Sequence, residues 1–214
     1  MGELILLRHG QTEWSKAGKH TGRTDIPLAP AGEAAAASLA PALAGRAFAA
    51  VFTSPAQRAV RTAELAGLPN GEDPGGGGPG GGGPKAERDP DLWEWDYGGY
   101  EGLTTPEIQR DRPGWYLWRD GVIPGGAGHP GETVDEVGAR ADRVLARAAE
   151  KLPGGDVALV AHGHVLRVLT ARWLRLPASA GRLFRLDTGA IGTLGTEHDQ
   201  PVITRWNAPP GSPR

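Results

Sequence analysis

The stretch Glu3-Leu-Ile-Leu-Leu-Arg-His-Gly10 begins with a short apolar run and ends with Arg8, His9 and a glycine. An uninterrupted apolar run of this length is typical of a strand that is buried on both faces of a parallel sheet. Arg8 and His9 would then lie at the carboxyl end of that strand. Because ligands bind at this edge in open α/β sheets, the segment predicts a fold class together with the position of a site.

The same pattern occurs twice more along the chain. Residues 50–53 form a strand-like run that leads into Ser54 to Arg58, and residues 156–161 form another that leads into His162. The sequence also predicts helices at 32–43, at 56–66, from 133 to about 152 and at 165–174. Ser54-Pro55 marks the start of the second helix, with Pro55 in the first helical position, and a Thr133–Glu136 capping box opens the third. Further strands are predicted at 183–186 and 191–194, with 202–205 as a third option. This alternation predicts an α/β protein with a largely parallel sheet.

The composition excludes several classes of protein. The 214 residues carry 23 Lys and Arg against 25 Asp and Glu, which gives no basic surface for nucleic acid or an anionic membrane. The absence of Cys rules out a disulfide scaffold, a thiolate zinc site and a cysteine nucleophile. No apolar run approaches the ~20 residues of a membrane span. We therefore expect a soluble, cytoplasmic protein that binds neither nucleic acid nor membrane.

Part of the glycine and proline excess of the chain lies in one segment. Residues 71–84 read GEDPGGGGPGGGGP. Such a segment has no large side chains to bury and a high backbone entropy, so it predicts a flexible loop. A phosphate-binding reading is disfavoured, because phosphate-binding loops lead directly into a helix and carry Lys or Ser/Thr at a set place. We expect a single domain over residues 1–208, interrupted by this loop and followed by a tail at 209–214.

Four side chains that follow the predicted strands suit a phosphate group. Arg8 and Arg58 offer planar forks of donors that match phosphate oxygens. A neutral imidazole from His9 or His162 can attack phosphorus and form a phosphohistidine, while the other donates to the equatorial oxygens. The sequence therefore predicts phosphoryl transfer at the edge of the sheet.

A leaving alcohol needs a proton, and Glu94 is the carboxyl group best placed by context to give it. Aromatic residues surround it in sequence, and such surroundings favour a protonated carboxyl. The aromatic residues between Trp93 and Trp118 fit two alternatives, which are plain core and the wall of a sugar-sized pocket. A metal held by His9, Glu94, His162 and His164 is disfavoured, because the last two point different ways on a strand-to-helix turn and no Asp cluster accompanies them. We expect no metal and no cofactor.

The motif Leu7-Arg-His-Gly-Gln-Thr-Glu-Trp14 resembles the signature of the histidine phosphatase superfamily, which has the phosphoglycerate mutase-like fold. The resemblance continues through residues 21–28, 53–62, 92–98, 100–102 and 161–164, and so covers nearly the whole chain outside 71–84. It implies a three-layer α/β/α fold with a mostly parallel central sheet. It also implies that His9 is the nucleophile, Arg8 and Arg58 the phosphate clamp, His162 the second imidazole and Glu94 the proton donor.

The same resemblance implies a set of substrate-binding residues, which are Gln11, Ser15, Thr21, Gly22, Tyr100 and Gly163. Ser15 stands where the family commonly has Asn, so any hydrogen bond from that Asn is not carried over to this chain. Several blocks, among them residues 94–102, 118–121 and 131–133, are similar to sedoheptulose-1,7-bisphosphatase-like sugar phosphatases. Mutases share an Arg-His pair after the acid, and Trp95 and Asp96 replace it here.

Together these features predict a metal-independent phosphomonoesterase that acts on small phosphorylated metabolites, in particular sugar phosphates or bisphosphates. A phosphoglycerate mutase is the alternative enzyme, and a phosphometabolite-binding module without turnover is the alternative outside enzymes. The sequence leaves a homodimer open.

Overall fold

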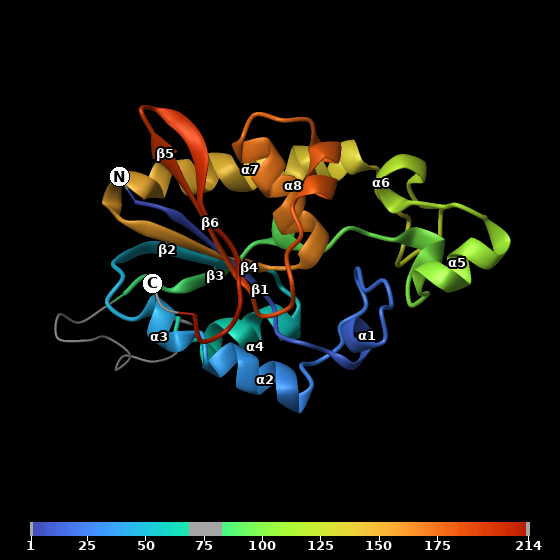
Figure 1. The fold of residues 1–214 in the computed structure, drawn as a ribbon, viewed down its shortest axis with the longest axis horizontal. Coiled ribbons are helices and arrows are strands. Elements are labelled where there is room, and N and C mark those ends of the chain that lie inside the picture. Colours follow the sequence, from blue (N-terminus) through green and yellow to red (C-terminus); the bar gives the residue numbers. More distant parts are fainter. Residues whose placement is uncertain (1, 69–82, 213–214) are drawn as a thin grey trace.

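The computed structural model describes residues 2–68 and 83–212. One six-stranded sheet with the order β3-β2-β4-β1-β5-β6 forms its centre (Figure 1). The strands are β1 (Leu4–Arg8), β2 (Phe48–Thr53), β3 (Ala86–Arg88), β4 (Asp156–Ala161), β5 (Ile191–Glu197) and β6 (Gln200–Ala208). The first four pair in parallel, whereas β5 and β6 are antiparallel to their neighbours. This mixed, mostly parallel sheet confirms the expected fold class.

Helices cover both faces of the sheet, so the fold has three layers (Figure 1). The α-helices are α1 (Glu13–Lys16), α2 (Pro30–Ala37), α3 (Ala40–Leu43), α4 (Gln57–Leu65), α5 (Thr105–Asp111), α6 (Leu117–Asp120), α7 (Val134–Lys151) and α8 (Gly163–Trp173). The 3₁₀ turns in the described part of the chain are η1 (Pro90–Leu92), η2 (Gly98–Tyr100), η3 (Leu152–Gly154) and η4 (Ala178–Leu183). None of the described helices is both long and apolar enough to cross a membrane.

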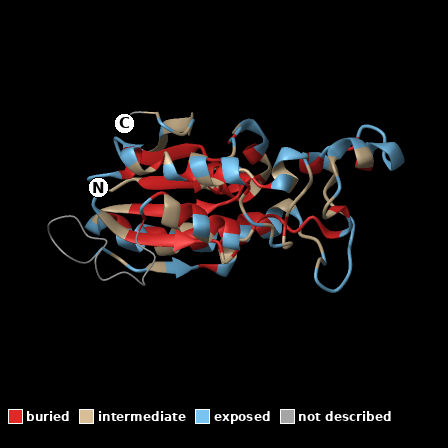
Figure 2. Cartoon of the chain, turned by 90° about the horizontal axis from the view of Figure 1, so that it is seen from below, coloured by how far each residue is buried: buried red, intermediate tan, exposed pale blue. Residues whose placement is uncertain are grey.

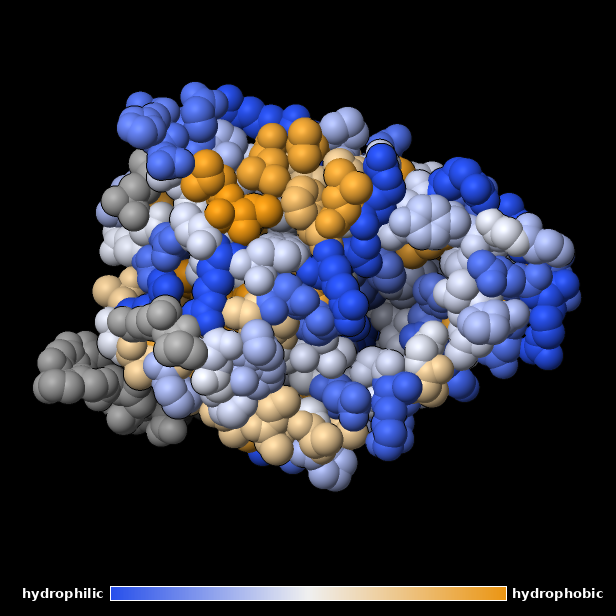
Figure 3. Space-filling view, in the orientation of Figure 1, coloured by the Kyte–Doolittle hydropathy of each residue, from blue (hydrophilic) through white to orange (hydrophobic). Residues whose placement is uncertain are grey.

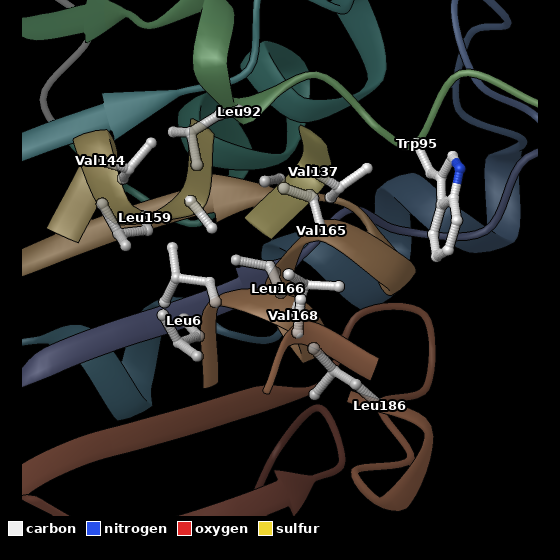
Figure 4. Close-up of a cluster of buried hydrophobic side chains, with 14 of the residues drawn as sticks. Leu6, Leu92, Trp95, Val137, Val144, Leu159, Val165, Leu166, Val168 and Leu186 are labelled. Atoms are coloured by element: carbon white, nitrogen blue, oxygen red, sulfur yellow. The ribbon is translucent and has the colours of Figure 1, made fainter. Parts of the chain in front are cut away.

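Alternate side chains of β1 enter two separate cores, because successive side chains of a strand point to opposite faces. Leu4 and Leu6 pack in the core formed with α7 and α8, part of which Figure 4 shows. Ile5 and Leu7 pack in the core beneath α3 and α4. All four are fully buried, and burial is concentrated in the strands (Figure 2). The apolar run at the start of the chain is therefore a central strand, as predicted.

The segment between β3 and α7 projects beyond the carboxyl ends of the parallel strands (Figure 1). It contains η1, η2, α5 and α6 together with most of the aromatic residues. The surface of this projection is mainly hydrophilic on the face of the molecule that Figure 3 shows. Hydrophobic residues gather elsewhere on that face, over β5 and β6. This projection brings Glu94 towards the edge where β1 and β4 end.

Three local predictions were wrong in detail. The predicted helix at 32–43 is two helices, α2 and α3, which are separated after Ser38, with Pro41 in the first turn of α3. Helix α4 begins at Gln57, so Pro55 precedes it, and the Asp25 carboxylate accepts the Gln57 N–H in place of a local cap. Residues 183–186 form no strand: Leu183 ends η4, and the carbonyl groups of Arg185 and Leu186 accept from the side chains of Trp206 and Arg8.

Other boundaries agree closely with prediction. The Thr133–Glu136 capping box opens α7, and β4 has the expected ends. Helix α8 starts at Gly163, two residues earlier than predicted, and the optional last strand is β6. The short elements α1, β3, α5 and α6 were not predicted. Most of the expected loop at 71–84 lies outside the described residues.

Candidate active site

His9 and His162 meet at the carboxyl edge of the sheet because β1 and β4 are parallel neighbours. Arg8 pairs with Ala161 in register, and the His9 backbone N–H donates to Ala161 O at 2.9 Å. The two imidazole ring centres are 5.1 Å apart, and both rings are buried. The structure therefore brings together the two histidines that the sequence placed after separate strands.

The hydrogen bond of His9 fixes which ring nitrogen is free. Nδ1 lies 2.7 Å from the carbonyl oxygen of Gly10. A carbonyl oxygen only accepts, so Nδ1 carries the hydrogen and Nε2 keeps its lone pair. Burial, together with the positive charges of Arg58 and Arg8, holds the pKa of His9 well below its usual value. His9 is therefore a neutral imidazole with an unprotonated Nε2, which is the form that can act as a nucleophile.

His162 is held in a defined tautomer between Arg58 and Ser54. Arg58 Nε donates to His162 Nδ1 at 3.2 Å, so that nitrogen is unprotonated. His162 Nε2 consequently carries the hydrogen and donates to Ser54 Oγ at 2.7 Å. Burial and the nearby charge of Arg58 hold the pKa of His162 well below its usual value. Ser54, which reaches the site from the end of β2, was not among the predicted site residues.

Arg58 is fully buried at the start of α4 and binds the backbone of residues 22–24, in the loop that precedes α2. Its Nη1 donates to Thr24 O at 3.0 Å and its Nη2 to Gly22 O at 3.1 Å. Its Nη1 also lies 3.7 Å from the carboxylate of Asp25, which caps the same helix. Arg58 is thus in contact with the second imidazole and with the predicted binding residue Gly22.

Arg8 packs against the first turn of α8. Its Nη1 donates to Leu186 O at 2.6 Å, and its buried Nε has no partner among the described residues. A Cβ on Gly163 would lie 3.1 Å from the Arg8 Cζ and 3.2 Å from Nε. Glycine at 163 therefore lets the guanidinium lie close against the start of the helix, where Nε remains a donor for an anion.

Glu94 is anchored at the amino-terminal end of α8. Its Oε2 accepts the backbone N–H of His164 and its Oε1 that of Val165, both at 2.9 Å. Oε1 also accepts the Trp95 N–H at 2.9 Å. The predicted aromatic surroundings are thus only part of the environment of this carboxyl group. Because α8 begins directly after His162, these bonds hold Glu94 at the helix start that follows His162.

His164 and Tyr97 form a further pair next to Glu94. From the sequence, His164 was considered for a disfavoured metal site, and Tyr97 was among the aromatic surroundings of Glu94. The Tyr97 hydroxyl and His164 Nδ1 are 2.6 Å apart. Burial holds the pKa of Tyr97 well above and that of His164 well below the usual values. The phenol therefore keeps its hydrogen and donates it to the imidazole. The position of His164, two residues after His162, was the signal in the sequence that could have placed it near the site.

Both ring nitrogens of His162 have protein partners, which argues against a metal ion held by the His162–His164 pair. Among residues 2–68 and 83–212 no group of three or more His, Asp or Glu side chains has metal-site geometry.

The remaining predicted binding residues are placed in different ways. Gly22 contacts Arg58 through its carbonyl group, but its N–H donates to Glu101. The Ser15 hydroxyl accepts from Thr12 N and donates to Thr12 O, so it is used in the cap of α1. Thr21 donates to Lys19 O. Gln11 is half-buried, and its backbone carbonyl accepts the Ala29 N–H.

The aromatic cluster is mainly core. Tyr100 is buried, with its hydroxyl accepting from Arg112 at 2.8 Å, and Trp95 is fully buried. Trp95 and Trp118 also line a pocket of about 400 Å³, but none of His9, Arg58, Glu94 and His162 borders that pocket. Trp93 does reach the site, since its ring is parallel to that of His162 at a centre-to-centre distance of 6.4 Å.

Comparison with known proteins identifies the family of the chain. A family model described as histidine phosphatase superfamily, branch 1, matches residues 4–209. The chain belongs to the histidine phosphatase superfamily. An acid phosphatase from Mycobacterium tuberculosis is 40% identical over 198 residues, which cover 91% of this chain and 87% of that protein. Sedoheptulose 1,7-bisphosphatase from Saccharomyces cerevisiae is 35% identical over 195 residues, which cover 80% of this chain and 67% of that protein.

A solved structure of a Mycobacterium tuberculosis protein has a TM-score of 0.81 and 37% identity, and the match covers 97% of this chain and 98% of that one. The family match, the acid phosphatase and the bisphosphatase thus indicate that the chain is a phosphatase.

The buried histidines of this phosphatase predict a loss of stability in acid. The folded pKa values of His9 and His162 are lowered by burial, so the unfolded chain binds more protons once the pH falls below about 6.5. The free energy of unfolding should therefore fall by up to about 1.4 kcal/mol per pH unit for each ring. Urea unfolding at several pH values between 7.5 and 5 measures this slope.

The matched controls for the pH slope are His162→Gln and His198→Gln. The first removes one buried ring and should flatten the slope, whereas the second changes an exposed residue and should leave it as it is. Equal slopes in the wild type and in His162→Gln would contradict the assignment of a neutral, buried His162.

Proposed function

We propose that this chain is a metal-independent phosphomonoesterase in which His9 carries the phosphoryl group. The observation that carries the proposal is the hydrogen bond from His9 Nδ1 to Gly10 O, which leaves a neutral imidazole with its Nε2 lone pair beside Arg58, Arg8 and His162. Arg8 Nε and the guanidinium of Arg58 would surround a phosphate with donors and positive charge, and His162 Nε2 would exchange Ser54 Oγ for a phosphate oxygen when the phosphate binds.

In the first step, His9 Nε2 forms a bond to phosphorus while the bond from phosphorus to the ester oxygen breaks. The Glu94 carboxyl group gives its proton to that oxygen, so an alcohol leaves. The product of this step is a phosphohistidine at His9 and a carboxylate at Glu94.

In the second step, water attacks phosphorus and transfers a proton to the Glu94 carboxylate. The nitrogen–phosphorus bond breaks, inorganic phosphate forms, and Nε2 regains its lone pair. Glu94 therefore acts first as an acid and then as a base, which requires a fixed carboxyl group. Its bonds to the start of α8 provide this fixed position.

The substrates we propose are small phosphorylated metabolites, in particular sugar phosphates or bisphosphates. The support is the likeness to an acid phosphatase and to sedoheptulose 1,7-bisphosphatase. We also propose that substrate binding involves the predicted residues Gln11, Ser15, Thr21, Gly22, Tyr100 and Gly163. The family match over 4–209 also supports our proposal that residues 1–208 form a single domain.

Hydrolysis is favoured over mutase activity by the residues that follow Glu94. A mutase must hold a bisphosphorylated intermediate, which calls for further positive charge near the acid. Here Trp95 donates through Nε1 to Glu132 O, and Asp96 accepts the Gly98 N–H, so both positions serve local structure. Water is therefore the expected acceptor of the phosphoryl group.

Trapping the phosphoenzyme tests the proposal. Brief incubation with a ³²P-labelled sugar phosphate and denaturation in base should yield labelled protein, because a phosphohistidine survives base and is lost in acid. A screen of sugar mono- and bisphosphates, phosphoglycerates and nucleotides for phosphate release should then identify the best substrates. With 3-phosphoglycerate and 2,3-bisphosphoglycerate, formation of 2-phosphoglycerate faster than free phosphate would identify a mutase instead. Tight phosphate binding with neither label nor turnover would identify a binding module.

A further inference from the structure

We propose that Arg140, a buried arginine on α7, is a positioning residue that holds Glu94 in place for proton transfer. This inference rests on the proposed role of Glu94 as the proton donor. Arg140 is 5% exposed and lies on the inner face of α7, in the stripe of core residues with Val137 and Val144. A charged side chain at such a position requires full pairing, since an unpaired buried charge is costly.

All five N–H groups of the Arg140 guanidinium have acceptors, and three of these are backbone carbonyls around Glu94. Nη1 donates to Asp91 O at 2.7 Å and to Trp93 O at 2.5 Å, and Nη2 donates to Glu94 O at 3.1 Å. Nε and Nη2 donate to the two carboxylate oxygens of Glu132, at 2.8 and 3.0 Å. One side chain thus binds the backbone on both sides of Trp93 and at Glu94 itself.

Glu132 holds the next part of the same segment. Its Oε2 accepts the Asp96 N–H at 2.8 Å, its backbone N–H donates to Asp96 O, and its carbonyl accepts from Trp95 Nε1. Arg140 and Glu132 therefore form one pair that binds the segment from Asp91 to Asp96 through its backbone. Residues 93–97 have no regular secondary structure, so no ladder of helix or strand hydrogen bonds could do this.

Two helices then determine the position of the carboxyl group. The start of α8 binds the Glu94 side chain, and α7 binds its backbone through Arg140. If the backbone shifts, the carboxyl group must leave either its α8 donors or the leaving oxygen. Arg140 touches no reacting atom in this arrangement, and its effect on the reaction passes through Glu94.

This role predicts a loss that depends on the leaving group. A sugar alcohol needs a proton to leave, whereas 4-nitrophenolate leaves readily without one. Glu94→Gln should therefore lower kcat/KM, which reports the steps up to departure of the leaving group, by about 100-fold for the best sugar phosphate and far less for 4-nitrophenyl phosphate. Arg140→Lys keeps the charge but not the fork of five donors, and we expect the same contrast, with about 10-fold loss on the sugar phosphate and less than about 3-fold on 4-nitrophenyl phosphate.

The double variant Arg140→Lys/Glu94→Gln should be no slower on the sugar phosphate than Glu94→Gln alone, because a residue that acts through another adds nothing once that group is gone. Arg143→Lys is the matched control, since Arg143 lies on the outer face of α7 and pairs with Asp91 through its carboxylate. It should leave both rates unchanged. Circular dichroism verifies folding, and where Arg140→Lys fails to fold, Glu132→Gln tests the same pair with a milder change.

The outcomes separate the two proposals. If Glu94→Gln lowers kcat/KM equally for both substrates, the proton-donor role is wrong and the inference is overturned with it. A second set of outcomes would overturn the positioning role alone, when Glu94→Gln does show the contrast between the substrates. These outcomes are that the folded Arg140→Lys or Glu132→Gln variant slows both substrates equally, that it shows no loss, or that it multiplies the loss of Glu94→Gln. Contrast in both variants without a multiplied loss supports it.

Discussion

Replacing His9 by alanine should lower kcat by ~10⁴-fold or more, because the variant has no atom that can accept the phosphoryl group. The loss should be similar for a sugar phosphate and for 4-nitrophenyl phosphate, since both reactions need the nucleophile. In the base-stable phosphoenzyme assay the variant should carry no label. These three results together distinguish loss of the nucleophile from loss of the proton donor, which affects the two substrates unequally.

The His9→Ala variant should remain folded. Its ring makes one side-chain hydrogen bond, to the carbonyl group of Gly10, and the variant loses a buried but neutral group. His198→Ala, in the exposed turn between β5 and β6, is the control and should keep wild-type activity. Wild-type turnover or a labelled protein in folded His9→Ala would contradict the proposed mechanism.

The central part of the site could be predicted because it depends on the sheet. Three apolar runs with polar residues at their carboxyl ends indicated buried parallel strands, and parallel strands end at the same edge. That reasoning alone places His9 and His162 together, and β1 and β4 are indeed neighbours. It also brought Arg58 to the same edge through β2 and α4.

Residues that act through long-range side-chain bonds were not predicted. Arg140 reads as an ordinary charged residue, although its place in the core stripe of α7 was a usable signal. The expected strand at 183–186 has apolar residues, but its carbonyl groups bind Arg8 and Trp206. Such bonds depend on tertiary positions, which no local pattern contains.

Replacing Arg58 by alanine should impair both catalysis and folding. The variant removes a guanidinium from the proposed phosphate site, for which we expect a loss of about 10³-fold in kcat/KM. It also leaves Gly22 O, Thr24 O and His162 Nδ1 without their buried donor, so the free energy of unfolding should fall by about 3 kcal/mol or more. Urea unfolding and steady-state kinetics, measured where the variant is folded, give the two effects separately.

Arg58→Lys distinguishes the charge from the shape of the guanidinium. Lysine keeps a positive charge but cannot donate to His162, Gly22 and Thr24 in the same plane, so we expect it to recover only part of the lost activity. Arg61→Ala, one turn further along α4, is the control: its side chain is 48% exposed and pairs with Glu33 and Glu64. That change should alter stability by no more than about 0.5 kcal/mol and leave activity intact. Arg58 differs from Arg61 in its burial and in its bonds to His162, Gly22 and Thr24 at the edge of the sheet. Equal effects of Arg58→Ala and Arg61→Ala would therefore contradict the proposed role of Arg58.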